Sequence, residues 1–365
     1  MCCDGVTLMT RVEILSPYPP GISGGITTFS QNLKTAFEMR FGLDCSLATP
    51  LFGPLSGSRH PLATSGSLGL ILLQLIRRKP QAVFVQGHAA LLIPAIVYTR
   101  LFRGSTLVFT FHTEWGRMSD LKARIIKWLL SQCTALTFVS SYLAERMTRL
   151  LRLPTGDSRV ILPGVAVEQP PSTEIAKISR LVEGRSPILS YIGKMTWKGK
   201  VEGLKVLISA LAEVRHQWPE VLLLVAGDGP FEDEVHQFVS DLGLERHVSF
   251  LGNVQSPESC LRFSNLHVHI SLRENLALAI LEAMAVGVPV IASDTGAVRE
   301  IVSDGQTGML VRPEVADVSN GIVWLLSHPE IARAIGAAGK NSVLTKFSWS
   351  QAARDYLRIS GTIPN

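Results

Sequence analysis

The sequence predicts an α/β protein of two domains, each built on a doubly wound parallel β-sheet. Three observations lead to this prediction. The chain has 365 residues, which is too long for most single cores and suits two domains. Short apolar runs typical of buried strands alternate with segments of helical periodicity. Several of these runs end in a glycine turn before a helix, so we expect ligands at the carboxyl ends of the strands.

Composition and charge narrow the class of protein. Hydrophobic residues make up 46% and charged residues 18%, as in an ordinary globular enzyme. Residues 1–175 hold 17 Lys and Arg against 10 Asp and Glu, whereas residues 176–365 hold 18 against 20. The basic half is suited to an anionic partner. Its cations are not interleaved with stacking aromatic residues, so we expect no nucleic-acid binding.

The sequence also bears on location. The N-terminus lacks the apolar core of a signal peptide, and the longest apolar runs, 68–76 and 89–97, are too short to span a bilayer. No two cysteines form a CxxC pair, which favours reduced thiols. We expect a cytoplasmic protein that is either soluble or peripheral on the inner face of a membrane.

A proline- and glycine-rich turn follows the first predicted strand, Arg11–Ser16. It ends in Gly24 and Gly25, directly before an amphipathic helix that contains Phe29, Leu33 and Phe37. Glycines at a helix start leave backbone amides open to a phosphate. A plain strand-to-helix turn is the alternative.

His112 is the main candidate side chain of the first half. It directly follows a predicted strand, 106–111, and should lie in the crevice at the strand ends. His88 follows another strand and is a weaker candidate. The strands predicted in this half after the first are 82–86, 106–111 and 135–139, and residues 160–164 are expected to end the first domain.

Residues 118–130 form a predicted basic helix. Lys122, Lys127 and Trp128 alternate there with apolar residues such as Ile125, a pattern that suits an anionic membrane surface. A half-buried surface helix is the alternative. Arg146, Arg149 and Arg152 on the next helix add to the basic character.

The second half begins after a predicted linker, 168–187, that has few apolar anchors. Its first strands are predicted at 188–192, 221–226 and 247–251. Lys194 and Lys198 follow the first of these and could hold a diphosphate as point charges. His267 and His269 alternate on a further strand with no third metal ligand, so we assign them to packing.

The stretch 271–311 is the most informative. A helix is predicted from near Leu276 to a stop at Gly287, followed by a strand at 288–292. Glu274 precedes the helix, and Glu282 is inside it, about 8–9 Å beyond Leu276. A helix N-terminus attracts phosphate, and a carboxylate at that reach could accept hydrogen bonds from both ribose hydroxyls. The spacing therefore suits a nucleotide-sugar.

Glu274, seven residues, Glu282, then EAMAVGVPVIAS, Glu300 and DGQTGMLV resemble the EX7E signature of retaining glycosyltransferases of family 4, also called group 1. The resemblance implies the GT-B architecture, in which two Rossmann-like domains face an interdomain cleft. It places the first domain at 1–170, the donor domain at 171–347, and a last stretch, 348–365, back on the first domain. It also implies a UDP- or GDP-linked donor and no metal or cofactor.

Three departures from the family pattern stand out. Leu276 and Ala277 replace the usual Phe and Gly or Pro, and Lys194 replaces the usual Arg. Lys keeps the charge but loses the planar fork of Arg, which affects how the diphosphate is held. Gly296 and Ala297 stand where two glycines are usual.

The resemblance also assigns roles. Lys194 and Lys198 would bind the diphosphate, Glu282 the ribose, and Glu274 and His112 the sugar. The acceptor would be a hydroxyl of a glycan, a lipid-linked molecule or a small molecule. The catalytic set is thus His112, Lys194, Lys198 and Glu274. The donor-binding set is Gly24, Gly25, Gly227, Val254, Asn275, Leu276, Ala277, Leu278 and Glu282.

Three alternatives remain at this point: a catalytically silent subunit that binds a nucleotide-sugar, a nucleotide-sugar 2-epimerase of the same architecture, and a phosphorylase. A silent subunit would leave the donor intact, and an epimerase would isomerise it without an acceptor. A phosphorylase would usually carry a cofactor lysine and longer inserts, neither of which is evident.

Overall fold

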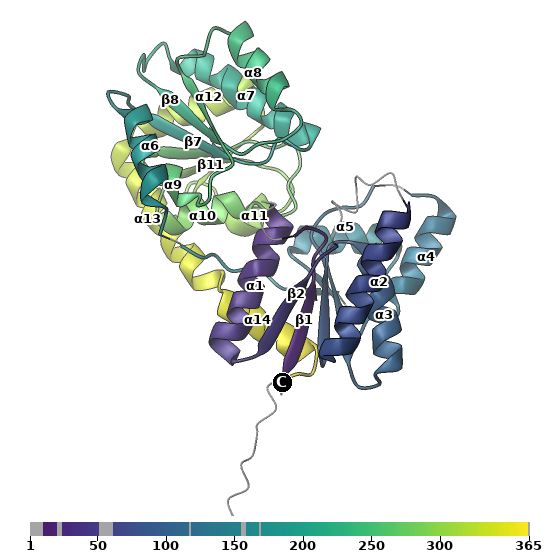
Figure 1. Ribbon diagram of the computed structural model, residues 1–365. Helices are drawn as coiled ribbons and strands as arrows, with labels where there is room; N and C mark the ends of the chain where they lie inside the picture. The colour runs from purple at the N-terminus through teal and green to yellow at the C-terminus, as the bar shows by residue number, and fades with distance from the viewer. Residues whose placement is uncertain are drawn as a thin grey trace, which may run out of the picture. The chain divides into compact units, whose positions relative to one another are not determined.

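The computed structural model describes residues 10–19, 24–50, 61–116, 118–154, 158–167 and 169–363, without the side chains of 61–65 and 158. The chain divides into two compact units (Figure 1). The N-terminal unit comprises Met1–Gly164 and Phe347–Asn365, and the C-terminal unit comprises Val165–Lys346.

The N-terminal unit contains a parallel sheet of six strands in the order β2-β1-β3-β4-β5-β6. Its strands are β1 (Arg11–Leu15), β2 (Asp44–Ala48), β3 (Ala82–Gln86), β4 (Thr106–Phe111), β5 (Ala135–Phe138) and β6 (Ser158–Val160). Its helices are α1 (Gly25–Phe41), α2 (Pro61–Arg78), η1 (Ala89–Leu91), α3 (Leu92–Leu101), α4 (Asp120–Leu130), α5 (Ser141–Leu151) and α14 (Trp349–Ile359).

Helices cover both sides of this sheet: α1 and α14 lie on one side, and α2 and α3 on the other (Figure 1). Although α14 is the last helix of the chain, it packs into this unit. The Tyr356 hydroxyl lies 3.0 Å from the Thr110 hydroxyl of β4, and the Trp349 ring packs edge-on against Phe29 of α1.

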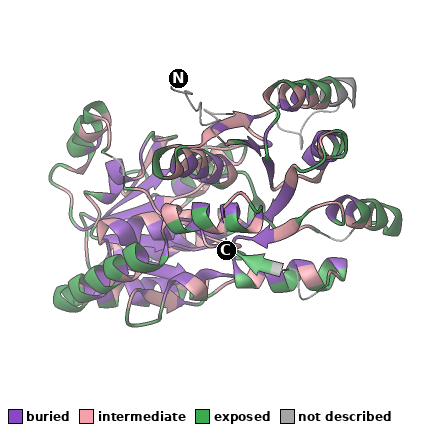
Figure 2. Ribbon diagram, turned by 90° about the horizontal axis from the view of Figure 1, so that it is seen from below, coloured by how far each residue is buried: buried purple, intermediate pink, exposed green. Residues whose placement is uncertain are grey.

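The C-terminal unit contains a second parallel sheet, in the order β12-β11-β10-β7-β8-β9. Its strands are β7 (Ile188–Ile192), β8 (Leu222–Ala226), β9 (Val248–Gly252), β10 (Leu266–His269), β11 (Val290–Ser293) and β12 (Met309–Val311). Its helices are α6 (Ser172–Val182), α7 (Lys198–Val214), α8 (Glu232–Asp241), α9 (Glu258–Leu261), α10 (Leu278–Val286), α11 (Val298–Ile301), α12 (Val315–Ser327) and α13 (Pro329–Lys346). In both units the strands are largely buried and the helices expose their outer sides (Figure 2).

The predicted linker at 168–187 is wrong, because α6 occupies most of it. The helix buries one large apolar residue, Ile178. A carboxylate supplies the other anchor: Glu174 accepts hydrogen bonds from the Gln255 amide at 2.7 Å and from the Ser259 hydroxyl. The paucity of apolar residues that suggested a linker is thus offset by polar contacts within the C-terminal unit.

Two strands at the edges of the first sheet also differ from expectation. Strand β2 lies where the sequence predicts none, because its Asp and Ala residues are weak strand formers. Residues 160–164, expected to end the first domain, overlap only the last residue of strand β6 (Ser158–Val160), and the chain from 161 to 164 is irregular.

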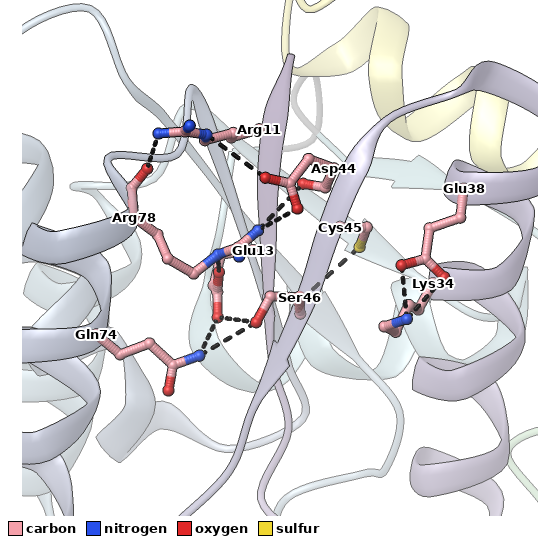
Figure 3. A network of polar contacts seen from close by, with 9 residues as sticks. All are labelled: Arg11, Glu13, Lys34, Glu38, Asp44, Cys45, Ser46, Gln74 and Arg78. Atoms are coloured by element: carbon pink, nitrogen blue, oxygen red, sulfur yellow. Dashed lines mark hydrogen bonds and ion pairs between the residues drawn. The ribbon is translucent and has the colours of Figure 1, made fainter. Parts of the chain in front are cut away.

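A buried carboxylate fastens α2 to β1 and β2 (Figure 3). Glu13 of β1 is fully buried and accepts hydrogen bonds from Arg78 Nε at 3.0 Å, Gln74 Nε2 at 2.7 Å and Ser46 Oγ at 3.0 Å. Burial raises the pKa of Glu13, and the hydrogen bonds and the Arg78 charge only partly offset this. Because Gln74 and Arg78 belong to α2, the network sets the position of that helix against the sheet.

Candidate active site

The two central strands of the C-terminal sheet define a topological switch point. Strands β8 and β9 continue from β7 on one side, whereas β10, β11 and β12 lie on the other. In open α/β sheets, ligands bind at the carboxyl ends of the strands where the order reverses. Lys194 follows β7, and Glu274 follows β10, so both predicted residues come from the strands of the switch point.

Glu274 is buried, and its carboxylate contacts two side chains, His269 and Lys200. Its Oε2 lies 3.1 Å from His269 Nε2 and 3.5 Å from Lys200 Nζ, and the side chain is 6% exposed. Burial alone would raise the pKa of Glu274, but the Lys200 charge and the His269 hydrogen bond lower it to about 2. Glu274 is therefore a fixed, ionised hydrogen-bond acceptor at neutral pH.

The backbone of Glu274 is held as closely as its side chain. Its carbonyl oxygen accepts a hydrogen bond from the Ala297 amide at 3.0 Å. Gly296 has φ +57°, and a Cβ built there would lie 1.8 Å from the same oxygen. Only glycine permits this approach, so Gly296 and Ala297 together fix the loop that carries Glu274.

Helix α10 begins at Leu278, two residues later than predicted. Asn275 and Leu276 are half-buried, and Ala277 is buried, extended, and has no capping side chain. The hydrogen bond from the Ala297 amide to the Glu274 carbonyl oxygen favours this extended backbone conformation before the helix. Glu282 is thus four residues into the helix, about 6 Å along its axis instead of the expected 8–9 Å. The predicted stop at Gly287 is confirmed, since Gly287 caps the helix with φ +96°.

The glycine turn after β8 packs against the loop after β7. A Cβ on Gly227 would lie 2.1 Å from the Gly193 carbonyl oxygen, and the Gly227 amide donates to Gly252 at 2.8 Å. Lys194 Nζ lies 2.5 Å from Asp228 Oδ1 in the same turn. Val254, which follows β9, is half-buried, and Lys198, which opens α7, is exposed. Main-chain contacts therefore bring the β7, β8 and β9 loops together.

In the N-terminal unit the order reverses between β1 and β3. Gly24 and Gly25 precede α1 on the β1 side. His112, after β4, lies with Nε2 2.8 Å from Gln86 Oε1 at the end of β3, and its ring packs edge-on against Phe29. Burial lowers the pKa of His112 to about 3, so the imidazole is neutral at pH 7. Because Nε2 faces a carbonyl oxygen, it carries the proton and leaves Nδ1 as an acceptor.

Sequence reasoning missed three residues of these sites: Lys200, His269 and Asp228. Lys200 lay beside the Lys198–Gly199 pair, and Asp228 lay in the recognised GDGP turn, but neither position revealed its partner. His269 was assigned to packing, and its Nε2 bond to Glu274 is a second role. His267 does pack, with Nδ1 3.2 Å from Ser190 Oγ. His88 caps η1 by accepting from the Ala90 amide.

Comparisons with known proteins match both halves of the chain. The family profile "Glycosyltransferase Family 4" matches residues 26–169, and "Glycosyl transferases group 1" matches residues 173–342. A phosphatidyl-myo-inositol mannosyltransferase of Mycobacterium tuberculosis is 29% identical over 380 residues, covering 97% of each chain. A GDP-mannose-dependent alpha-(1-6)-phosphatidylinositol monomannoside mannosyltransferase of Mycolicibacterium smegmatis is 29% identical over 264 residues, covering 68% of each.

Solved structures agree on the fold. The sucrose-phosphate synthase of Thermosynechococcus elongatus superposes with a TM-score of 0.80 at 19% identity, covering 97% of this chain and 98% of that one. The two six-stranded parallel sheets, together with this similarity to a solved structure, confirm the predicted GT-B architecture. The chain belongs to the family 4, or group 1, glycosyltransferases and is an enzyme that transfers a sugar from a nucleotide-sugar donor.

Proposed function

We propose that this enzyme transfers a hexosyl group from a GDP- or UDP-linked sugar to an acceptor hydroxyl with retention of anomeric configuration. The observation that carries the proposal is the ionised Glu274 carboxylate beside Lys200, at the strand ends that also bear Lys194. An ionised carboxylate suits hydrogen bonds from sugar hydroxyls, and the neighbouring lysines suit the charge of a diphosphate. The two mannosyltransferase relatives favour GDP-mannose as the first donor to test and a lipid-linked acceptor ahead of a soluble glycan or small molecule.

In the proposed donor site, Lys194 and Lys198 bind the diphosphate, and Asp228 holds Lys194 in place. The N-terminal end of α10 adds to this positive potential through the helix dipole. Glu282, one turn inside α10, accepts hydrogen bonds from the ribose hydroxyls. Gly227 and Val254 line the position of the base.

Roles toward the sugar are proposed for each unit by itself. Glu274 and the backbone amides of 275–278 would hold hydroxyl groups from the C-terminal unit. His112 would accept a hydroxyl hydrogen bond at Nδ1, since its Nε2 is committed to Gln86. Gly24 and Gly25 would present backbone amides to the donor. Because the pKa of His112 is about 3, its role is that of a neutral acceptor and not a charge.

Retention is proposed to follow from attack on the face that the diphosphate leaves. The bond between the sugar anomeric carbon and the phosphate oxygen breaks, and the acceptor oxygen bonds to that carbon on the same face. The acceptor proton passes to the departing phosphate oxygen, which yields a nucleoside diphosphate and a glycoside. The carboxylate of Glu274 is engaged by two donors, which weakens it as a covalent nucleophile. The protein then contributes positioning and electrostatic stabilisation.

A labelled-sugar assay tests this function. Purified enzyme is incubated with radiolabelled GDP-mannose or UDP-glucose and a membrane lipid extract, and the label is followed into the lipid phase. Lys194→Met is expected to reduce transfer by about a hundredfold, because one charge that stabilises the leaving group is lost. Lys177→Met, an exposed lysine on α6, is the control and should retain full rate.

The outcomes separate the alternatives. If the radiolabel is recovered on a nucleotide-sugar whose sugar has isomerised, in a reaction without acceptor, the enzyme is an epimerase. Donor that binds and remains intact with every acceptor would contradict the transferase proposal. Product with inverted anomeric configuration, read by NMR, would overturn the retaining mechanism alone.

A further inference from the structure

The outward surface of α2, α3 and α4 exposes large apolar side chains from every helix; we call it the outer α2–α4 face. Leu70 and Leu73 lie on α2, and Ile93, Val97 and Leu101 lie on α3. Their exposed fractions run from 40% to 63%. The three residues of α3 are spaced by four, so they form one stripe along the helix.

Helix α4 is apolar on two sides. Ile126 and Leu129 are buried against the unit, whereas Leu121, Ile125 and Trp128 are 69%, 52% and 52% exposed. Packing within the unit uses Ile126, Leu129 and the neighbouring Leu130. The second set forms an outward stripe that the unit itself leaves uncovered in the described part of the chain.

The three stripes face the same way. The chain crosses from β2 to β3, β4 and β5 in one direction along the sheet, so α2, α3 and α4 lie on one side of it. Figure 1 shows α2 and α3 side by side, with α4 next to them. The Glu13 network fastens α2 in this layer, and Arg100 of α3 lies over the Trp128 ring of α4, 5.6 Å from its centroid. The outer α2–α4 face is therefore one contiguous surface.

Exposed apolar residues in the C-terminal unit are spread differently. They lie on several separate elements: Leu181 on α6, Trp324 on α12, Ile331 and Leu344 at opposite ends of α13, and Val167, Trp197 and Leu272 outside the helices and strands. Single exposed apolar residues are normal on soluble proteins, whereas a contiguous patch marks an interaction surface.

The charge around the patch identifies the partner. Residues 61–130 contain nine Lys and Arg against two acidic residues, Glu114 and Asp120, an excess of +7 that equals the whole excess of residues 1–175. Glu114 pairs with Arg146. Lys122 and Arg124 flank the α4 stripe and have no acidic side chain within 4 Å among the described residues. The later arginines of α5 contribute less, because Arg149 pairs with Glu145.

We propose that the outer α2–α4 face docks on an anionic lipid bilayer. Leucine and isoleucine side chains would enter the interface, Trp128 would lie at the headgroup level, and the cations would contact lipid phosphates. An apolar patch flanked by Lys122 and Arg124, which lack an acidic partner among the described residues, fits this surface better than a protein, whose complementary face would need matching acids. The proposal does not depend on the donor chemistry and would bring the enzyme to lipid-borne acceptors.

Vesicle flotation tests the proposal. The full chain is mixed with vesicles of phosphatidylglycerol and phosphatidylcholine, or of phosphatidylcholine alone, at 50 mM and 500 mM salt. Binding is expected only to the anionic vesicles, and weaker at high salt because the charges are screened. Ile125→Glu with Trp128→Glu, and separately Lys122→Glu with Arg124→Glu, should each weaken binding more than about tenfold. Leu344→Glu on α13, a residue with 52% exposure, is the matched control and should bind normally.

Circular dichroism confirms that the variants fold, which exposed positions should permit. No flotation with anionic vesicles at low salt would overturn the proposal. Equal flotation of all variants would overturn it too, because binding would then occur elsewhere. Sedimentation of the enzyme as a dimer that Ile125→Glu with Trp128→Glu dissociates would assign the face to a second copy of the chain instead.

Discussion

Gly296→Ala is expected to lower the free energy of unfolding of the C-terminal unit by more than about 3 kcal/mol. Two costs combine. Alanine at φ +57° has a left-handed conformation that costs about 1–2 kcal/mol. Its Cβ would also lie 1.8 Å from the Glu274 carbonyl oxygen, which is backbone and cannot turn away. The loop that carries Glu274 must then move, and a displacement near 1 Å reduces transfer by about a hundredfold.

Gly305→Ala is the matched control for this prediction. Gly305 has a similar φ of +69°, and a Cβ there meets nothing within 4 Å. It should show the conformational cost alone and keep its activity. Denaturant unfolding and the labelled-sugar assay measure both effects. Equal loss in the two variants would mean that the close approach to Glu274 has no consequence.

Lys200→Met is expected to destabilise the unit by about 3 kcal/mol, because it leaves a buried carboxylate without its cation. Burial would raise the pKa of Glu274, and the Lys200 charge together with the His269 hydrogen bond lowers it to about 2, so loss of Lys200 disfavours the ionised carboxylate. The double variant Lys200→Met with Glu274→Gln should recover most of the stability, since glutamine is neutral and still accepts from His269. Lys205→Met, which breaks a more exposed pair with Glu234, should cost at most about 1 kcal/mol.

The ion pair between Lys200 and Glu274 also predicts that the free energy of unfolding depends on pH. A carboxylate with a lowered pKa contributes stability above its unfolded pKa, and this contribution disappears as the pH falls through the folded value. The wild-type unit should therefore lose this stability between about pH 4.5 and pH 2, and Glu274→Gln should lose less over that window. Single-variant stabilities that add up in the double variant would contradict a direct interaction between Lys200 and Glu274.

Much of the fold could be predicted because central strands of parallel sheets are continuous apolar runs. Strands β3, β4 and β7 have the predicted bounds. Edge strands carry weaker signals: β2 depends on pairing with β1 and on bonds to the Glu13 network, neither of which is visible locally. The same reason explains α6, whose carboxylate anchor reaches residues far along the chain.

For a related reason, only some residues of the site could be predicted from the sequence. Glu274 and Glu282 have a fixed spacing in one helix and its entry loop, so their pattern could be recognised in the sequence. Lys200 reaches Glu274 because β7 and β10 are neighbours in the sheet. His269, the last residue of β10, reaches Glu274 through the course of the short loop between them, which no local propensity shows. The start of α10 was misplaced because tertiary contacts of Ala297, and not helix propensity, decide where the loop ends.

Calorimetric titration with GDP, UDP, ADP and TDP measures donor-nucleotide binding without requiring an acceptor. We expect one nucleotide to bind the wild-type enzyme, and Glu282→Ala to weaken this binding by about 1.5–3 kcal/mol, tenfold or more. Glu330→Ala, on the exposed start of α13, should bind as wild type. If no nucleotide bound, or if Glu282→Ala bound as tightly as wild type, the proposed donor site at α10 would be contradicted.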